Sequence, residues 1–331
     1  MTARIEPATT AAIGRAVEAL RAGDLVAFPT ETVYGLGADA GNRAAVRRIF
    51  AAKGRPADHP LIVHLPDASH VSRWAREFSI DARALAEAFW PGPLTLILPR
   101  TNRASDFVTG GEDGVGLRVP SHPIARELLR EFGDGVAAPS ANRFGRISPT
   151  TAAHVADDLG DAISLILDGG PCAVGIESTI VAFTNGRPVL LRPGGIPVAD
   201  LARVLRAPLG SPDGAAPRAP GTLPAHYAPR TAAALVAPDA LRAELTQFAA
   251  RDEVAAVLGR TIARPGDFEG AWITAQADAT SYAHDLYANL RALDAANADV
   301  ILIEAPPPDD DWLAVRDRVT RATRGEDDDR D

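Results

Sequence analysis

The sequence is poor in several residue types, and each scarcity narrows the kind of protein it can encode. Among 331 residues there is one cysteine, Cys172, which excludes an internal disulfide framework and a zinc site built from several cysteines. It also fits a reducing, cytoplasmic compartment. No run approaches the roughly 18 consecutive apolar residues of a membrane span. The first ten residues, MTARIEPATT, lack the apolar stretch of a secretory signal.

Lysine is the scarcest charged residue. Of 34 lysines and arginines, Lys53 alone is lysine. A lysine ends in a compact ammonium, whereas an arginine ends in a wide planar fork. We therefore interpret position 53 as one that requires an ammonium, with chance retention of a single lysine as the alternative.

An excess of positive charge is also missing. Residues 1–206 contain 22 basic and 22 acidic side chains, and residues 207–331 contain 12 and 21, so the net charge of −9 lies in the last third. This balance gives no support to a protein that coats nucleic acid through its overall field.

The length is about twice that of a usual single domain, so we expect two domains. Residues 1–206 alternate apolar strand-like runs with helix-period segments, which is typical of an α/β layer. We expect helices near 10–20, 42–53, 67–76, 81–89, 122–132, 150–159 and 197–206, and strands at 25–28, 61–65, 95–99, 116–120, 135–139, 164–168, 178–183 and 188–192. Successive strands near 164–192 without a helix between them indicate a mixed sheet.

Residues 207–230 are rich in Pro, Gly and Ala and have no periodicity, so we interpret them as a linker. Residues 231–324 repeat a compact strand and helix pattern that predicts a small, doubly wound, Rossmann-like domain. The acidic end, residues 325–331, is predicted to be disordered.

The common nucleotide-binding motifs are absent. The single lysine lies in AAKGRP, so no glycine-lysine phosphate loop exists. The segment YGLGADAG places glycines at 35, 37 and 41 and has Ala40 where a dinucleotide fingerprint requires glycine. A nucleotide site in this protein must therefore use another arrangement.

Two polar segments of the first half are candidates for ligand binding. FPTETVYGLG (28–37) leads from a strand into a polar turn whose hydroxyls suit a small ligand, or it is an ordinary capped connection. Lys53 and Arg55, just past a predicted helix end, suit phosphate oxygens, or they stabilise the helix dipole. We expect Lys53 to be an exposed pocket residue. His64 on the next strand is either a satisfied core histidine or a ligand contact.

Further polar motifs follow later strands. They are APSAN (138–142) with SPT (148–150), GIESTIV (175–181) and LRPGG (191–195). Short hydroxyl and amide side chains where strands end are typical of ligand sites in α/β proteins, and they are equally good turn formers.

Together, PTETVYGLG, KGRP with PLIVHL, PGPLTLIL (91–98), GLRVP, APSAN, SPT, GIESTIV and LRPGG, in this order, resemble the L-threonylcarbamoyladenylate synthases of the YrdC type. The motif PAHYAP (224–229) and the second α/β domain resemble the longer, two-domain branch. The resemblance covers nearly the whole chain. It implies a twisted mixed sheet with flanking helices for the first domain.

The resemblance also implies an activity: synthesis of L-threonylcarbamoyl-AMP from L-threonine, bicarbonate or CO2, and ATP with Mg²⁺, with release of pyrophosphate. The product serves threonylcarbamoylation of an adenosine next to the anticodon of tRNA. The implied partners are downstream tRNA threonylcarbamoyltransferase proteins, with tRNA itself as a further candidate and no membrane.

The resemblance assigns residues to three groups. The central constellation is Lys53, Arg55, Ser140 and Asn142; the threonine contacts are Thr32, His64, Arg118, Ala138 and Ser178; and the ATP contacts are Arg55, His59, Ser140, Ser148, Arg192 and Tyr227, without protein metal ligands. Arg118 is the expected fork for the carboxylate of threonine. Tyr227 implies that the linker folds over the nucleotide as a lid.

One position departs from the family pattern, because His59 stands where we expect asparagine. Histidine still donates a hydrogen bond to a ribose or phosphate. Cys172 is interpreted as a small buried apolar residue. The rival readings are a module that binds tRNA or double-stranded RNA without catalysis, and a carbamoyltransferase, whose zinc-binding cysteines this chain lacks.

Overall fold

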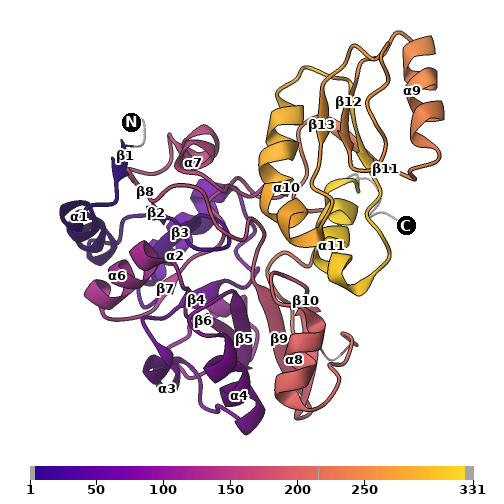
Figure 1. Cartoon of the computed structure of the whole chain (residues 1–331). Helices are drawn as coiled ribbons and strands as arrows, with labels where there is room; N and C mark the ends of the chain where they lie inside the picture. Colours follow the sequence, from indigo (N-terminus) through magenta and orange to yellow (C-terminus); the bar gives the residue numbers. More distant parts are fainter. Residues whose placement is uncertain (1–3, 215, 325–331) are drawn as a thin grey trace. The chain divides into compact units, whose positions relative to one another are not determined.

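The computed structural model describes residues 4–214 and 216–324, so the tail predicted for 325–331 lies outside the described residues. The chain forms two compact units (Figure 1). The first contains the residues up to Phe144 and Ser148–Thr222, and the second contains Gly145–Ile147 and the residues from Leu223 onward. The chain therefore passes from one unit to the other three times.

The sheet of the first unit is mixed, as predicted. In the part of the chain that is described it has ten strands in the spatial order β1-β8-β2-β3-β7-β4-β6-β5-β9-β10. It contains parallel pairs, such as β4 with β6, and antiparallel pairs, such as β5 with β6. The strands are β1 (Arg4–Pro7), β2 (Val26–Phe28), β3 (Gly35–Asp39), β4 (Ile62–His64), β5 (Leu94–Pro99), β6 (Gly114–Arg118), β7 (Val136–Ala137), β8 (Leu165–Asp168), β9 (Thr179–Thr184) and β10 (Arg187–Arg192).

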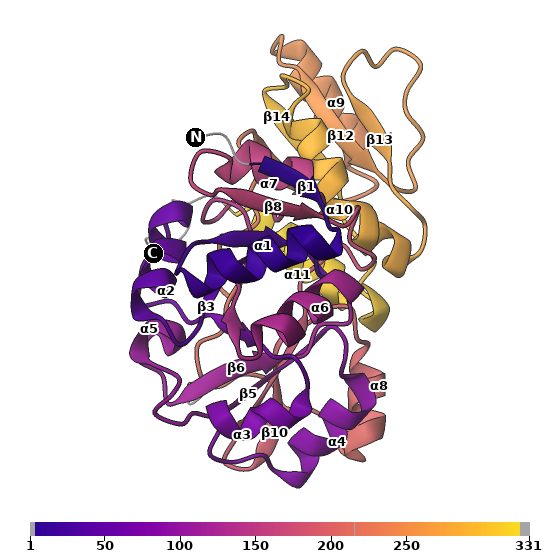
Figure 2. The same cartoon turned by 90° about the vertical axis from the view of Figure 1, so that its left-hand side faces the viewer.

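Helices cover this sheet. They are α1 (Thr10–Arg21), α2 (Arg43–Lys53), α3 (Val71–Trp74), α4 (Ile80–Phe89), α5 (Asp106–Thr109), α6 (Pro123–Phe132), α7 (Ala152–Leu159) and α8 (Val198–Leu205), with a short 3₁₀ helix at Ala68–His70. The helices α1 and α6 lie side by side (Figures 1 and 2) and bury Leu20 and Leu129 against the sheet. Asn42 caps the start of α2, and Gly54 ends it with a left-handed φ of 64°, as the sequence predicted.

Strand β3 was not predicted, because its sequence GLGAD has the composition of a turn. A Cβ at Gly37 would lie 2.8 Å from a ring carbon of Phe28 and 3.0 Å from Val136. The glycine therefore makes room for an aromatic ring on the neighbouring strand. The same register sets Gly35 opposite Ser140, which brings two of the predicted motifs together.

Residues 207–214 and 216–222, in the first part of the predicted linker, pack in the first unit. The backbone of Gly210 exchanges hydrogen bonds of 2.9 and 3.0 Å with Pro188 and Leu190 of β10. The Arg218 guanidinium donates to Glu112 at 2.6 Å, and Ala219 joins an apolar cluster on the sheet. This segment is thus fixed by hydrogen bonds, charge and burial.

The second unit is the predicted small α/β domain. Its sheet is parallel, with the order β11-β14-β12-β13 among the described residues. Helix α9 lies on one face, and α10 and α11 lie on the other (Figure 1). The elements are β11 (Ala232–Val236), α9 (Leu241–Ala250), β12 (Ala255–Gly259), β13 (Trp272–Thr274), α10 (Ala279–Asp294), β14 (Val300–Glu304), a 3₁₀ helix (Asp310–Trp312) and α11 (Leu313–Ala322). Over residues 4–214 and 216–324, no helix combines the length and apolarity needed to cross a bilayer.

Candidate active site

Lys53 lies at the centre of the candidate site. It ends α2, and its ammonium donates to the backbone oxygens of Ser140 at 2.6 Å and Asn142 at 2.5 Å. Ser140 and Asn142 lie 87 and 89 residues after Lys53 along the chain. The K-x-R motif (Lys53 to Arg55) and the S-x-N motif (Ser140 to Asn142) therefore form one cluster. The expectation of an exposed lysine is wrong, because the residue is only 3% exposed. Burial lowers the pKa of Lys53 well below its usual range, and nearby Arg55 lowers it further.

Arg55 and His59 lie in the loop that follows α2. Arg55 is buried and donates to the backbone oxygen of Pro60 at 2.8 Å. The Phe144 ring lies 5.8 Å from its guanidinium carbon and 5.3 Å from the His59 ring. Burial lowers the pKa of His59, with a further contribution from Arg55. His59 is therefore neutral at physiological pH and has both a donor and an acceptor nitrogen.

The S-x-N segment runs beside the loop that precedes β3. The amide of Ala141 donates to the backbone oxygen of Tyr34, and the amide of Tyr34 donates to the backbone oxygen of Pro149, both at 2.9 Å. Ser148 is fully buried, and its hydroxyl donates to the buried carboxylate of Glu177. These contacts fix both ends of the segment that contains Ser140 and Ser148, two of the predicted ATP contacts.

Arg118 and His64 are neighbours, because β4 and β6 pair in parallel with these two residues in register. The Arg118 guanidinium donates to the Glu31 carboxylate at 2.7 Å and to the Gly92 oxygen at 3.3 Å. The other Glu31 oxygen accepts from the Ser121 amide at 3.0 Å. Burial alone would raise the pKa of Glu31, but the Arg118 charge and hydrogen bond hold it below its ordinary value.

His64 is a buried histidine with one ring nitrogen that makes no hydrogen bond to the described residues. Burial, and then the Arg118 charge, lower its pKa to about 3, so the imidazole is neutral. Its Nδ1 is buried and has no hydrogen-bond partner among the residues that the structure describes. A buried ring nitrogen without a partner favours the ligand contact over the satisfied core histidine.

Ser178 is linked to Arg192. The Arg192 guanidinium donates to the backbone oxygen of Ser178 at 3.0 and 3.1 Å and to its hydroxyl at 3.1 Å. The Ser178 hydroxyl also bonds the Thr95 hydroxyl at 2.8 Å. Thr32, 1% exposed, shares a hydrogen bond of 2.8 Å with Thr30. Ala138, buried, donates its amide to Ile62 of β4 at 2.9 Å.

Tyr227 lies in the second unit. Its backbone has φ +63°, and its ring is 1% exposed. The ring lies 5.7 Å from that of Tyr287, and the guanidinium carbon of Arg318 lies 5.2 Å from its centroid. Its packing partners are therefore residues of α10 and α11.

Two buried carboxylates received no role from the family resemblance. Glu31 holds Arg118, and Glu177 holds Ser148. Both were visible as acidic residues inside the motifs PTET and GIEST. An acidic residue among apolar and small neighbours is costly to bury unless it is paired. The presence of a glutamate in each of these motifs was therefore the sequence signal for a buried ion pair or hydrogen bond.

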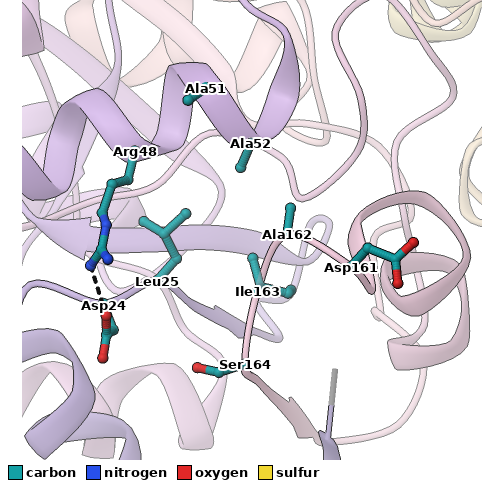
Figure 3. A pocket seen from close by; sticks show the side chains of 9 residues that line it. All are labelled: Asp24, Leu25, Arg48, Ala51, Ala52, Asp161, Ala162, Ile163 and Ser164. Carbon is teal, nitrogen blue, oxygen red and sulfur yellow. Dashed lines mark hydrogen bonds and ion pairs between the residues drawn. The ribbon is translucent and has the colours of Figure 1, made fainter. Parts of the chain in front are cut away.

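A separate hollow of about 400 Å³ lies beside α2 and is shown in Figure 3. In it, Arg48 donates to the Asp24 carboxylate at 2.7 Å. Its lining consists of Asp24, Leu25, Arg48, Ala51, Ala52, Asp161, Ala162, Ile163 and Ser164. None of the predicted site residues is among them, so this hollow is not the candidate active site.

Comparisons with known proteins found family models, relatives and a solved structure that cover most of the chain. A Sua5/YciO/YrdC family model described as "Telomere recombination" matches residues 18–194, and one described as "Threonylcarbamoyl-AMP synthase, C-terminal domain" matches 196–323. Threonylcarbamoyl-AMP synthases of Pyrococcus abyssi and Bacillus subtilis are each 40% identical to this chain, over 92% and 95% of its length and 92% and 93% of theirs. The crystal structure of P. abyssi Sua5 complexed with L-threonine is similar at a TM-score of 0.89 and 38% identity, covering 97% of both chains.

Proposed function

We propose, from the premise that this chain belongs to the threonylcarbamoyl-AMP synthase family, that it makes L-threonylcarbamoyl-AMP from L-threonine, bicarbonate or CO2, and ATP. The observation that carries the proposal is the Lys53 ammonium, which joins the K-x-R and S-x-N motifs through two backbone oxygens. Arg55 lies two residues further on. The reaction brings several anions together, so it requires cations fixed before the substrates arrive.

The first chemical step forms a carbamate. The unprotonated amine of threonine attacks the carbon of CO2. A nitrogen–carbon bond forms while one carbon–oxygen π bond breaks and its electrons move to that oxygen, and the nitrogen then loses a proton to water. We assign the carboxylate of threonine to Arg118, because a guanidinium matches a carboxylate as a fork. Glu31 supports this role, since its hydrogen bond orients the fork in advance. The free Nδ1 of His64 is the acceptor we assign to a donor group of threonine.

The second step transfers the nucleotide. A carbamate oxygen attacks the α-phosphorus of ATP, the bond from that phosphorus to the bridging oxygen breaks, and pyrophosphate leaves with the bonding electrons. Lys53, Arg55 and Arg192 would stabilise the negative charge that accumulates on the phosphate oxygens. Ser140, Ser148, His59 and Tyr227 remain assigned to ATP, and Thr32, Ala138 and Ser178 to threonine.

Magnesium is proposed as part of the nucleotide substrate. In the residues described, no group of three or more His, Cys, Asp or Glu side chains is placed to hold a metal ion. Mg²⁺ is commonly held by substrate phosphates and water with few protein ligands, and this donor set fits that mode. When bound, the ion would neutralise charge on the triphosphate.

The product is a mixed anhydride, which water hydrolyses readily, so a transferase must take it up. We propose that downstream tRNA threonylcarbamoyltransferase proteins receive it in the cytoplasm, for modification of the adenosine next to the anticodon.

The test is incubation of the protein with L-threonine, bicarbonate, ATP and Mg²⁺. We expect pyrophosphate release that requires both threonine and bicarbonate, and threonylcarbamoyl-AMP in the mass spectrum. Arg55→Met should abolish both signals. Its matched control is Arg47→Met, which removes an exposed arginine of α2 and should leave them unchanged.

Two results would contradict the proposal. One is pyrophosphate release at the same rate without threonine, which would indicate a simple ATP hydrolase. The other is salt-sensitive binding of tRNA or double-stranded RNA, indifferent to ATP and threonine, with no turnover. That result would favour the RNA-binding module.

A further inference from the structure

The loop between Asn142 and Ser148 belongs to both units of the chain. Its two ends lie in the first unit, whereas its middle residues, Gly145–Ile147, belong to the second. Two of the three places where the chain passes between the units therefore lie within six residues of the S-x-N motif. Ser140 and Ser148, which lie on either side of this crossing, are both assigned above to the nucleotide.

Both ends of the loop are anchored to the cluster around Lys53. The amide of Phe144 donates to the backbone oxygen of Lys53 at 2.8 Å, and the Lys53 ammonium in turn holds Asn142. At the other end, the fully buried Ser148 bonds Glu177. A shift of the loop would therefore move these side chains or strain their hydrogen bonds.

The middle of the loop is held by the second unit through three hydrogen bonds. The Ala228 amide donates to the Gly145 oxygen at 2.8 Å. The Arg146 guanidinium donates to the Pro229 oxygen at 3.0 Å. The guanidinium of Arg291, on α10, donates to the Ile147 oxygen at 2.6 Å. Each residue from 145 to 147 thus has a partner in the second unit.

Two of these partners are the last residues of the motif HYAP (226–229). That motif is itself fixed within the second unit, because the Tyr227 ring is buried against Tyr287 of α10 and against Arg318 of α11. Arg291 lies one helical turn after Tyr287 on α10, so the same helix supports the motif and the loop. Helix α10 is therefore connected to the loop in two ways, directly through Arg291 and indirectly through the HYAP motif.

We infer that Arg291 is a positioning residue for ATP: it fixes the backbone of Ile147 and, through the covalent end of that loop, Ser148. This inference rests on the proposed function, and it gives the second domain a role in it. Arg291 acts through the loop backbone and is a positioning residue. Because Arg118, Glu31 and His64 lie on other segments of the first unit, affinity for threonine should not depend on it.

The test compares three variants of the full chain. Arg291→Met keeps the length and helix propensity of the side chain and removes its donors, whereas Arg291→Lys keeps a charged donor. Arg242→Met removes an exposed arginine of α9 and serves as the control. For each protein, KM for ATP, KM for threonine, kcat for pyrophosphate release and the melting temperature are measured.

We expect Arg291→Met to raise KM for ATP by about tenfold, which corresponds to roughly 1.4 kcal/mol, the scale of one charge-assisted hydrogen bond. KM for threonine should stay at the wild-type value, Arg291→Lys should recover part of the loss, and Arg242→Met should match wild type. This split between the two substrates is not expected from a general loss of stability.

Two outcomes would overturn the inference alone: an active, folded Arg291→Met protein with wild-type KM for ATP, or an equal rise of both KM values together with a lower melting temperature. A wild-type chain that releases no pyrophosphate would overturn the proposed function and this inference together.

Discussion

The buried pair of Glu31 and Arg118 allows a prediction whose size follows from the structure. Both side chains are almost fully enclosed, at 6% and 3% exposure, so solvent screens their interaction weakly. Removing one partner of such a pair costs roughly 3–5 kcal/mol, because the other charge remains buried. Glu31→Gln keeps the shape and one acceptor oxygen, so we take the lower end, about 3 kcal/mol.

The expected loss is measurable by thermal unfolding. For domains of this size, 1 kcal/mol shifts the melting temperature by about 2–4 °C, so Glu31→Gln should lower it by about 6–12 °C. KM for threonine should rise, because the Arg118 fork loses the group that orients it, while KM for ATP should change little. Asp113→Asn is the control, since it breaks an ion pair of 2.6 Å with Arg76 in which both partners are exposed. It should leave the melting temperature unchanged.

The difference between wild type and Glu31→Gln should depend on pH in a fixed direction. The pKa of Glu31 is lowered in the folded protein, so the carboxylate stabilises the fold above its ordinary pKa. This contribution is lost as the pH falls through the lowered value. The two proteins should therefore converge in acid. Equal melting temperatures at pH 7, or a gap that widens as the pH falls, would refute the reasoning.

Three further changes test other parts of the molecule. Lys53→Met should reduce pyrophosphate release by at least about 100-fold, as for the loss of one preorganised donor, with circular dichroism to verify the fold. His64→Gln should flatten the fall in stability between pH 6.5 and 4 seen by urea unfolding, because a histidine whose folded pKa is about 3 takes up its proton mainly on unfolding. Glu304→Gln should destabilise the second unit at neutral pH but not in acid. Burial raises the pKa of Glu304, yet hydrogen bonds from Thr261, Arg260 and Ile262 lower it overall.

The fold was largely predictable, because hydrophobic period and capping residues dictate local structure. Asn42 and Gly54 mark the ends of α2 in the sequence as they do in the structure. The parallel strands of the second domain stand out as apolar runs such as VILIE, since both of their faces are covered. Strand β3 was not predicted, because its glycines make room for the Phe28 ring of a neighbouring strand. A contact between residues of different strands leaves no pattern in the local sequence.

The candidate site was predictable as a set of residues but not as a network. The family resemblance named Arg118 and Ser148, yet it assigned no role to Glu31 and Glu177, the carboxylates that hold them. Such partners depend on register between strands and on loop paths, which arise only when the chain folds. The linker shows the same limit. Its composition indicates a linker, but Gly210 is fixed by residues 20 and 22 positions away and Arg218 by a residue 106 positions away.

The structure gives a physical reason why position 53 is a lysine although all 33 other Lys/Arg positions of the chain are arginine. The single nitrogen of the ammonium donates to two backbone oxygens, at 2.6 and 2.5 Å. The donors of a guanidinium lie on separate nitrogens of a wide planar group, so an arginine cannot reproduce this geometry. Burial lowers the pKa of Lys53, and a lysine can release its proton in such a place, whereas an arginine cannot. Lys53→Arg should therefore fail to support pyrophosphate release despite its conserved charge. Near wild-type turnover in that variant would show that position 53 requires only a cation, and that the single lysine is an accident of composition.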